Sequence, residues 1–330
     1  MSNDNKIIDR ILKRYNISGF EAMVKEMPLS DLQSLLIEIY NQRAKAITAK
    51  ELLEQYKKNR FVQHSKLSSN CFLEFDQLAY QLLPKDFQIL ELSPVCPLGS
   101  ISVMTPNSQN TVLTTIRNTE VCSDATNIMA LEASLQRKKF LLNKDAKTNP
   151  VKLCASHRLL RTQFFDNPLF LPHFKILSLC IAGKDGGNFQ FELSALRELI
   201  IYYYDLISKY ITEKISKKIS VKCIVFFHNE YLNERINNLA LELRDGHNIE
   251  VISKINTDEN WNYYHQIRFN IFISDRSTGE DFFIGDGGDT TWISQLLSDK
   301  KERFMISGLG CELFIQKIID LSMQEKKHDR

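Results

Sequence analysis

The sequence lacks several features that would assign it to a class directly. None of its apolar runs approaches the roughly 20 residues that a membrane-spanning helix needs, and the opening MSNDNKIIDR is too polar for a signal peptide. Its seven cysteines are dispersed and never form a CxxC pair, which argues against a zinc knuckle or a disulfide framework. Reduced thiols are typical of a cytosol. These absences predict a soluble, cytoplasmic protein with no membrane partner.

An excess of charge of one sign is also missing. The 42 lysines and arginines against 40 aspartates and glutamates give a formal net charge of +2. This balance gives no support for a general nucleic-acid surface, although it leaves a local basic patch open. The chain has no GxxxxGK[ST] or GxGxxG phosphate loop, and its seven histidines show no HxxxH or HExxH spacing. Phosphate loops and the common zinc motifs are therefore excluded.

What is present is an ordinary globular composition, with 43% hydrophobic and 25% charged residues among 330. The first 65 residues read as helices: apolar residues recur at helical spacing, Ser30 is a candidate cap, and Thr48 with Glu51 makes a capping box. Because this segment is charged and amphipathic, we expect an N-terminal helical appendage over residues 1–65. A purely structural brace is the main interpretation of it.

After residue 66 the pattern predicts strands in hairpin-like pairs separated by long helices. Expected helices cover residues 72–82, 125–140, 189–209, 229–244 (stopped by Gly246) and a final stretch through Ile319. Expected strands cover residues 112–117, 151–163, 173–183, 220–227, 249–253, 267–274 and 282–286. This alternation predicts an α+β fold on a largely antiparallel sheet over residues 66–322, followed by a frayed tail over 323–330.

The order of three of these pieces resembles the catalytic domain of class II aminoacyl-tRNA synthetases over roughly residues 70–322. A helix at 72–82 and the segment ELSP, ending at Pro94, are similar to motif 1, which implies a homodimer formed through this region. A plain core helix followed by a loop is the alternative. Further details resemble the branch that contains histidyl-tRNA synthetase and the regulatory subunit of ATP phosphoribosyltransferase.

Motif 2 of the family is matched by Arg161-Thr162-Gln163, a loop at 164–172 and a return strand that begins at His173 and Phe174. The resemblance implies catalytic roles for Arg161 and Gln163, with Arg161, His173 and Phe174 binding ATP. A planar guanidinium can hold phosphate or carboxylate bidentately. The alternative for an arginine on a strand is a surface ion pair. That alternative fits Arg158, which strand alternation places on the opposite face.

Motif 3 is matched by GLGCEL, residues 308–313, in which a glycine-rich strand is expected to lead into a buried helix. The resemblance implies that Gly310 contacts ATP and that Glu312 is catalytic and a ligand of Mg²⁺. Leu313 stands where the family has an arginine that grips the terminal phosphate. Leucine cannot replace that charge, so the sequence predicts weakened binding of ATP and Mg²⁺ unless Arg117 or Arg268 compensates.

Two further segments resemble the amino-acid pocket of the histidyl branch. In CSDATNIMALEA, Asp124 and Thr126 fall where the family binds the substrate α-amino group, although an Asp-x-Thr before a helix is also a routine N-cap. In NWNYYHQIRF, the tyrosines match as Tyr263 and Tyr264. Glu259 stands where the family has a catalytic arginine, which reverses the charge.

A third segment, FFIGDGGDTTWISQLL, resembles a glycine-rich turn beside the same pocket, with Gly287 and Gly288 matching. The alternative is a tight turn with no role in binding, since glycine tolerates positive φ. Asp289 and Thr290 replace the family's arginine and tyrosine, which leaves histidine specificity poorly supported. The chain ends eleven residues past Ile319, where the family continues into an anticodon-binding domain.

These features predict a divergent class II synthetase-like paralogue without that anticodon domain, which binds an amino acid or a related small ligand in a regulatory or other non-tRNA role. The alternative is an adenylate-forming ligase that activates an amino acid with ATP and passes it to a small molecule, a carrier protein or tRNA. Enzymatic activity and a tRNA partner therefore stay open. Both interpretations expect Arg161, Asp124 and Glu312 to surround one cavity.

Overall fold

The computed structural model describes residues 3–143, 148–162, 171–215, 219–256, 262–275 and 278–328. Its centre is an eight-stranded sheet in the order β1-β4-β5-β10-β9-β8-β6-β7. Neighbouring strands run antiparallel except for the two outer pairs, β1 with β4 and β6 with β7. The strands are β1 (Gln88–Ile89), β4 (Val151–Leu160), β5 (His173–Lys184), β6 (Ile219–Phe227), β7 (Glu250–Ile255), β8 (Ile267–Asp275), β9 (Asp281–Thr290) and β10 (Glu302–Gly310). The predicted α+β fold on a largely antiparallel sheet is confirmed.

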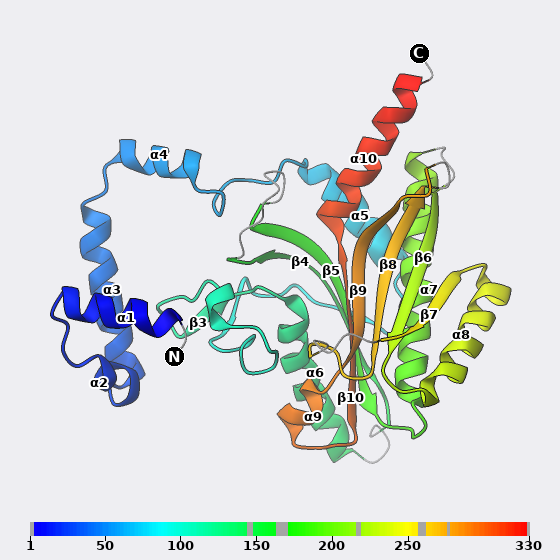
Figure 1. The fold of residues 1–330 in the computed structure, drawn as a ribbon, viewed down its shortest axis with the longest axis horizontal. Coiled ribbons are helices and arrows are strands. Elements are labelled where there is room, and N and C mark those ends of the chain that lie inside the picture. Colours follow the sequence, from blue (N-terminus) through cyan, green and yellow to red (C-terminus); the bar gives the residue numbers. More distant parts are fainter. Residues whose placement is uncertain are drawn as a thin grey trace.

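Helices cover both faces of the sheet (Figure 1). One face packs against four helices: α5 (Ser69–Leu82), α7 (Gln190–Lys214), α8 (Tyr231–His247) and α10 (Cys311–His328). The other face packs against α6 (Ala125–Leu142) and α9 (Trp292–Leu297). We call these the α7 face and the α6 face. Each has its own apolar cluster, so the sheet forms the middle layer of three.

Side-chain alternation along β4 decides which residue serves which face. Cys154 belongs to the cluster on the α7 face, whereas Leu153 and Ala155 belong to the cluster on the α6 face. The same alternation sends Arg158 to the α7 face, where its guanidinium lies 5.3 Å from the ring of Phe72 on α5. Cys154 and His157 are likewise separated, and burial raises the pKa of the Cys154 thiol to about 12. A nucleophile and base at this place are therefore excluded.

The N-terminal segment consists of helices with little burial. They are α1 (Asn3–Arg14), α2 (Phe20–Lys25), α3 (Leu29–Lys45) and α4 (Ala49–Lys58). No residue of α2, α3 or α4 is buried, and all four helices lie to one side of the sheet (Figure 1). The cap predicted at Ser30 is wrong, because α3 begins at Leu29 after Pro28 and Ser30 already lies in its first turn.

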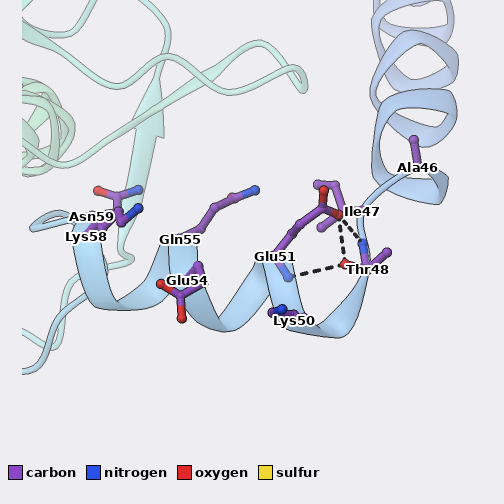
Figure 2. Close-up of a pocket in the computed structure, with 9 residues that line it drawn as sticks. All are labelled: Ala46, Ile47, Thr48, Lys50, Glu51, Glu54, Gln55, Lys58 and Asn59. Atoms are coloured by element: carbon purple, nitrogen blue, oxygen red, sulfur yellow. Dashed lines mark hydrogen bonds between the residues drawn. The ribbon is translucent and has the colours of Figure 1, made fainter.

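The capping box predicted at the start of α4 is confirmed (Figure 2). The backbone N–H of Glu51 donates to the hydroxyl of Thr48 at 3.3 Å, and the backbone N–H of Thr48 donates to the Glu51 carboxylate at 2.8 Å. The hollow drawn in Figure 2 is lined only by residues between Ala46 and Asn59, all of them exposed except the half-buried Glu54. It is the open side of a single helix and offers a ligand no second wall.

We expect Thr48→Ala to destabilise α4 by about 0.5–2 kcal/mol, because a first-turn N–H loses its acceptor. Hydrogen exchange of the α4 amides is the measurement, since this helix has no buried residue through which the loss would reach the core. Ser34→Ala, within the exposed α3, is the control. Unchanged exchange in α4 would contradict the assigned role of the cap.

Three expectations about local structure are wrong. Residues 112–117 form no strand; they fold back on β3 (Thr119–Val121) through two backbone hydrogen bonds and one isolated bridge at Thr114. Strand β4 ends at Leu160 and not at residue 163. Gly246 lies inside α8, and the left-handed C-cap is Asn248 with φ 57°. Apart from these three, helix α10 extends to His328 and so includes residue 322, where the domain is expected to end.

Two further observations concern the cysteines and the lengths of the helices. All seven cysteines are free thiols, and six of them are buried. Within the described ranges, every helix is too short or too polar to cross a membrane.

Candidate functional site

Asp124 stands at the N-terminus of α6 and caps it. Its Oδ1 accepts hydrogen bonds from the backbone N–H of Thr126 at 3.0 Å and from the Thr126 hydroxyl at 2.7 Å. The N-cap alternative is therefore correct for the Oδ1 atom. The Oδ2 atom takes no part in the cap and makes other contacts.

The second oxygen of Asp124 faces two residues that are distant in the sequence. The hydroxyl of Tyr263 donates to Asp124 Oδ2 at 3.0 Å, and Arg161 Nη2 lies 3.7 Å from the same atom. The side chain of Arg161 is 36% exposed and that of Asp124 16%. The structure thus brings together Asp124, Thr126, Arg161 and Tyr263, four of the residues predicted for the site.

Arg161 is held in place from two sides. Its Nε donates to the carbonyl oxygen of Ser123 at 3.0 Å, and its guanidinium lies 5.3 Å from the ring centroid of Phe174 on β5. Its backbone N–H donates to the carbonyl of Pro172 at 2.8 Å, just beyond the end of β4. A guanidinium fixed by Nε and a ring keeps its outer N–H donors directed at the space beside Asp124, where an anion would be bound bidentately.

Tyr263 and Tyr264 pack edge to face, with ring centroids 5.1 Å apart, and Tyr263 also packs on Trp292 of α9 at 5.5 Å. Burial raises the pKa of both phenols well above the ordinary value, and the neighbouring aspartates raise it further. Both tyrosines therefore remain protonated hydrogen-bond donors. The Cys122 thiol beside this group is also fully buried, and burial raises its pKa, which makes it a poor nucleophile.

Gly287 and Gly288 lie within strand β9, so the tight-turn alternative is wrong. Neither has a positive φ; the requirement for glycine is space. A Cβ on Gly288 would lie 2.3 Å from the carbonyl oxygen of Ile267 and 2.5 Å from the ring of Tyr264. A Cβ on Gly287 would lie 2.5 Å from the ring of Phe269. Gly288 therefore admits the ring of Tyr264 beside the site, whereas Gly287 lies on the α7 face, where Phe269 packs, and does not join the site.

Sequence reasoning missed Asp286, which precedes the two glycines on β9. It shares the face of Gly288 by alternation and pairs in register with Gly308 of β10 and Asn270 of β8. Arg268 Nη2 lies 4.0 Å from the Asp286 carboxylate. Burial raises the pKa of Asp286, although Arg268 and a hydrogen bond from Tyr264 lower it. Reading GDGGD as a strand and not as a turn would have placed this carboxylate in the site.

The motif-3 residues do not all join this group. Gly308 and Gly310 end β10, and the predicted strand-to-helix step into α10 is confirmed. Glu312, in the first turn of α10, contacts residues of the α7 face: Arg158 Nη1 donates to its Oε2 at 3.1 Å, and so does the backbone N–H of Lys175 at 3.3 Å. The hydroxyl of Ser65 donates to its Oε1.

His173 belongs to the Glu312 group as well. Its Nδ1 lies 3.0 Å from Arg158 Nη1, and its Nε2 is bonded to the carbonyl of Gln63. Glu312 already accepts three hydrogen bonds from the protein, and Leu313 is uncharged. The residues predicted to bind triphosphate and Mg²⁺ therefore do not lie together around one site. Among the residues the structure describes, no three His, Cys, Asp or Glu side chains gather as metal ligands. Gln163 and Glu259 lie outside the described residues.

Comparison with known proteins gives the fold a family context. No protein-family model and no curated protein matches the sequence. Among solved structures, the chain is similar to apo histidyl-tRNA synthetase from S. aureus, with 12% identity and a TM-score of 0.53 over 80% of this chain and 69% of that one. It is also similar to an ATP phosphoribosyltransferase regulatory subunit/histidyl-tRNA synthetase from Bacillus halodurans, with 10% identity and a TM-score of 0.54 over 82% and 90%.

A third similar structure is described as a threonyl-tRNA synthetase from Aeropyrum pernix, with 10% identity and a TM-score of 0.53 over 74% of this chain. The chain spans 58% of that structure's length. At these identities the likeness concerns the fold. Together with the antiparallel sheet and its flanking helices, it shows that this chain has the class II synthetase-like fold.

Proposed function

We propose that this chain is a class II synthetase-like paralogue that binds an amino acid between Asp124 and Arg161. The observation that carries the proposal is the meeting of these two side chains, 3.7 Å apart and both reached by solvent, at the junction of α6 and β4. An ammonium group complements the carboxylate, and a carboxylate complements the guanidinium. A zwitterionic amino acid has both groups on one carbon, so one ligand can satisfy both side chains.

The surrounding residues support this assignment. Thr126 and Tyr263 fix the orientation of the Asp124 carboxylate, and Ser123 and Phe174 fix Arg161. Preorganised partners reduce the entropy that is lost when a ligand binds. The partly buried setting strengthens charge pairing relative to open water.

Asp124→Asn is expected to weaken amino-acid binding by about 1.5–3 kcal/mol, or roughly tenfold to a hundredfold, because a charged hydrogen-bond partner becomes neutral. Asparagine is an equally good N-cap, so α6 should keep its stability. Calorimetry with each amino acid on both proteins is the measurement. Asp245→Asn, at an exposed position of α8 away from the site, is the matched control. Equal affinities for the wild type and Asp124→Asn would reject the site.

The second candidate is an adenylate-forming ligase. Arg161 packed on Phe174 favours it, since a guanidinium fixed on a ring can hold a phosphate as well as a carboxylate. ATP, if bound, would supply the adenylyl group that activates the carboxylate, with pyrophosphate as the leaving group, and Arg161 would hold a phosphate oxygen. Amino-acid-dependent exchange of pyrophosphate into ATP separates the candidates: exchange supports the ligase, and binding without exchange supports the non-catalytic paralogue.

We also propose that the protein works as a homodimer through the region of α5. Apolar side chains stay exposed there and in the segment that follows: Leu73 is 70% exposed and Leu98 45%. A second copy would cover them. Sedimentation at micromolar concentration is the test, and a monomer at all concentrations would contradict the proposal.

A further inference from the structure

Asp286 is a carboxylate in the site that lacks a strong partner. Its neighbour in register on β10 is Gly308, which has no side chain that could pair with the carboxylate. The nearest cation, Arg268, stands 4.0 Å away, beyond hydrogen-bond distance. The Asp286 side chain is 37% exposed, so a ligand can reach it.

Arg268 is committed elsewhere. Its Nε donates to the side-chain oxygen of Asn270 at 3.0 Å, and its guanidinium lies 6.0 Å from the ring centroid of Tyr264. Burial raises the pKa of Asp286 despite Arg268 and the hydrogen bond from Tyr264. The charged carboxylate is therefore incompletely stabilised, and an added cation would stabilise it further.

The tyrosine pair joins Asp286 to the amino-acid site. Tyr263 donates to Asp124, and its neighbour Tyr264 lies near Asp286, where its hydroxyl lowers the pKa of the carboxyl. The two rings are in contact, which places one carboxylate beside each phenol. The charge of Asp124 raises the pKa of Asp286, and that of Arg161 lowers it. A ligand held at Asp124 and Arg161 can thus extend a side chain toward Asp286.

From this arrangement we propose that Asp286 is a specificity-determining residue, and that it selects an amino acid whose side chain ends in a cationic nitrogen, an ammonium or guanidinium group. The inference rests on the proposed amino-acid site and specifies its substrate class. In the complex, the α-ammonium pairs with Asp124, the α-carboxylate with Arg161 and the terminal cation with Asp286.

The test compares ligands that differ in the terminal group alone. L-lysine and L-norleucine share a four-carbon side chain, and lysine adds the ammonium. Calorimetry should give lysine or its shorter analogue L-ornithine an affinity about tenfold above norleucine, with L-glutamate weakest, since one charge-assisted contact changes an equilibrium by about that factor. Asp286→Asn should lower the affinity for lysine to about that for norleucine, so that the preference is lost.

Arg268→Gln provides the opposite test, because it removes the positive charge that lies 4.0 Å from Asp286 and partly offsets its negative charge. It should raise the affinity for lysine and leave that for norleucine unaltered. Norleucine or glutamate binding as tightly as lysine to the wild type would overturn this inference alone, since binding through Asp124 and Arg161 would persist. A preference for lysine that survives Asp286→Asn would also overturn it. Failure of every amino acid to bind would overturn the proposed function and this inference together.

Discussion

Arg137→Met is expected to destabilise the protein by about 3–5 kcal/mol, because the fully buried Glu302 carboxylate loses its bidentate partner and is left with Lys184 at 3.2 Å. Arg137 Nε and Nη2 donate to the two carboxylate oxygens of Glu302 at 2.8 and 3.0 Å, and neither side chain is exposed. Arg137 Nη1 also donates to the carbonyl of Asn149. The pair joins α6 to β10, so its loss loosens the α6 face. Chemical denaturation is the measurement.

The double variant Arg137→Met with Glu302→Leu should recover most of that loss, because no buried charge is then left unpaired. Lys184, 3.2 Å from Glu302, keeps its pairing with Asp299. Lys138→Met, at the next and exposed position of α6, is the control and should change stability by less than about 0.5 kcal/mol. A single variant as stable as the control would contradict the assigned role of the pair.

Gly288→Ala is expected to cost about 1–3 kcal/mol in stability, with the larger value if the backbone cannot shift. The new methyl group would meet the carbonyl oxygen of Ile267 at 2.3 Å, and backbone cannot rotate away as a side chain can. It would also push on the ring of Tyr264, 2.5 Å away, so amino-acid binding should weaken along with stability.

Gly246→Ala is the matched control for that substitution. Its Cβ would meet nothing within 4 Å, and the residue lies within α8. Alanine should stabilise that helix by about 0.5–1 kcal/mol. Denaturation of both variants, with lysine binding as a second measurement, tests the contrast. Equal stability of the two variants would contradict the prediction, because it would show that β9 accommodates a methyl group at Gly288.

The regular helices and strands were predictable because the spacing of apolar residues along the chain indicates which side chains are buried. The amphipathic pattern of residues 125–140 predicted α6, and the apolar run of residues 220–227 predicted β6, each to within two residues at either end. The capping box at Thr48 was equally predictable, since both of its hydrogen bonds join residues three apart in the sequence. Local chemistry of this kind needs no knowledge of the tertiary structure.

The parts that failed depend on distant partners. Glycines 287 and 288 looked like a turn because nothing in the sequence shows that the rings of Phe269 and Tyr264 fill the space above a strand. Gly246 looked like a helix end, but Asn248 takes the left-handed conformation two residues later. Arg161 and Asp124 were expected to meet, and they do, whereas Glu312 was expected with them and is held by Arg158. Only strand alternation, applied to each residue in turn, separates these two groups.

Arg158, on β4, and Arg161, just beyond the end of that strand, belong to opposite surfaces of the sheet. They share no hydrogen-bond partner among the contacts described above. Arg158 contacts Glu312 and His173. These two residues also form hydrogen bonds with Ser65 and Gln63, and so attach the end of the N-terminal segment to the sheet. Arg161 faces the amino-acid site. Substitutions at Glu312 and Asp124 should therefore have additive free energies, so the anchoring of the N-terminal helices and the chemistry of the ligand can be changed one at a time.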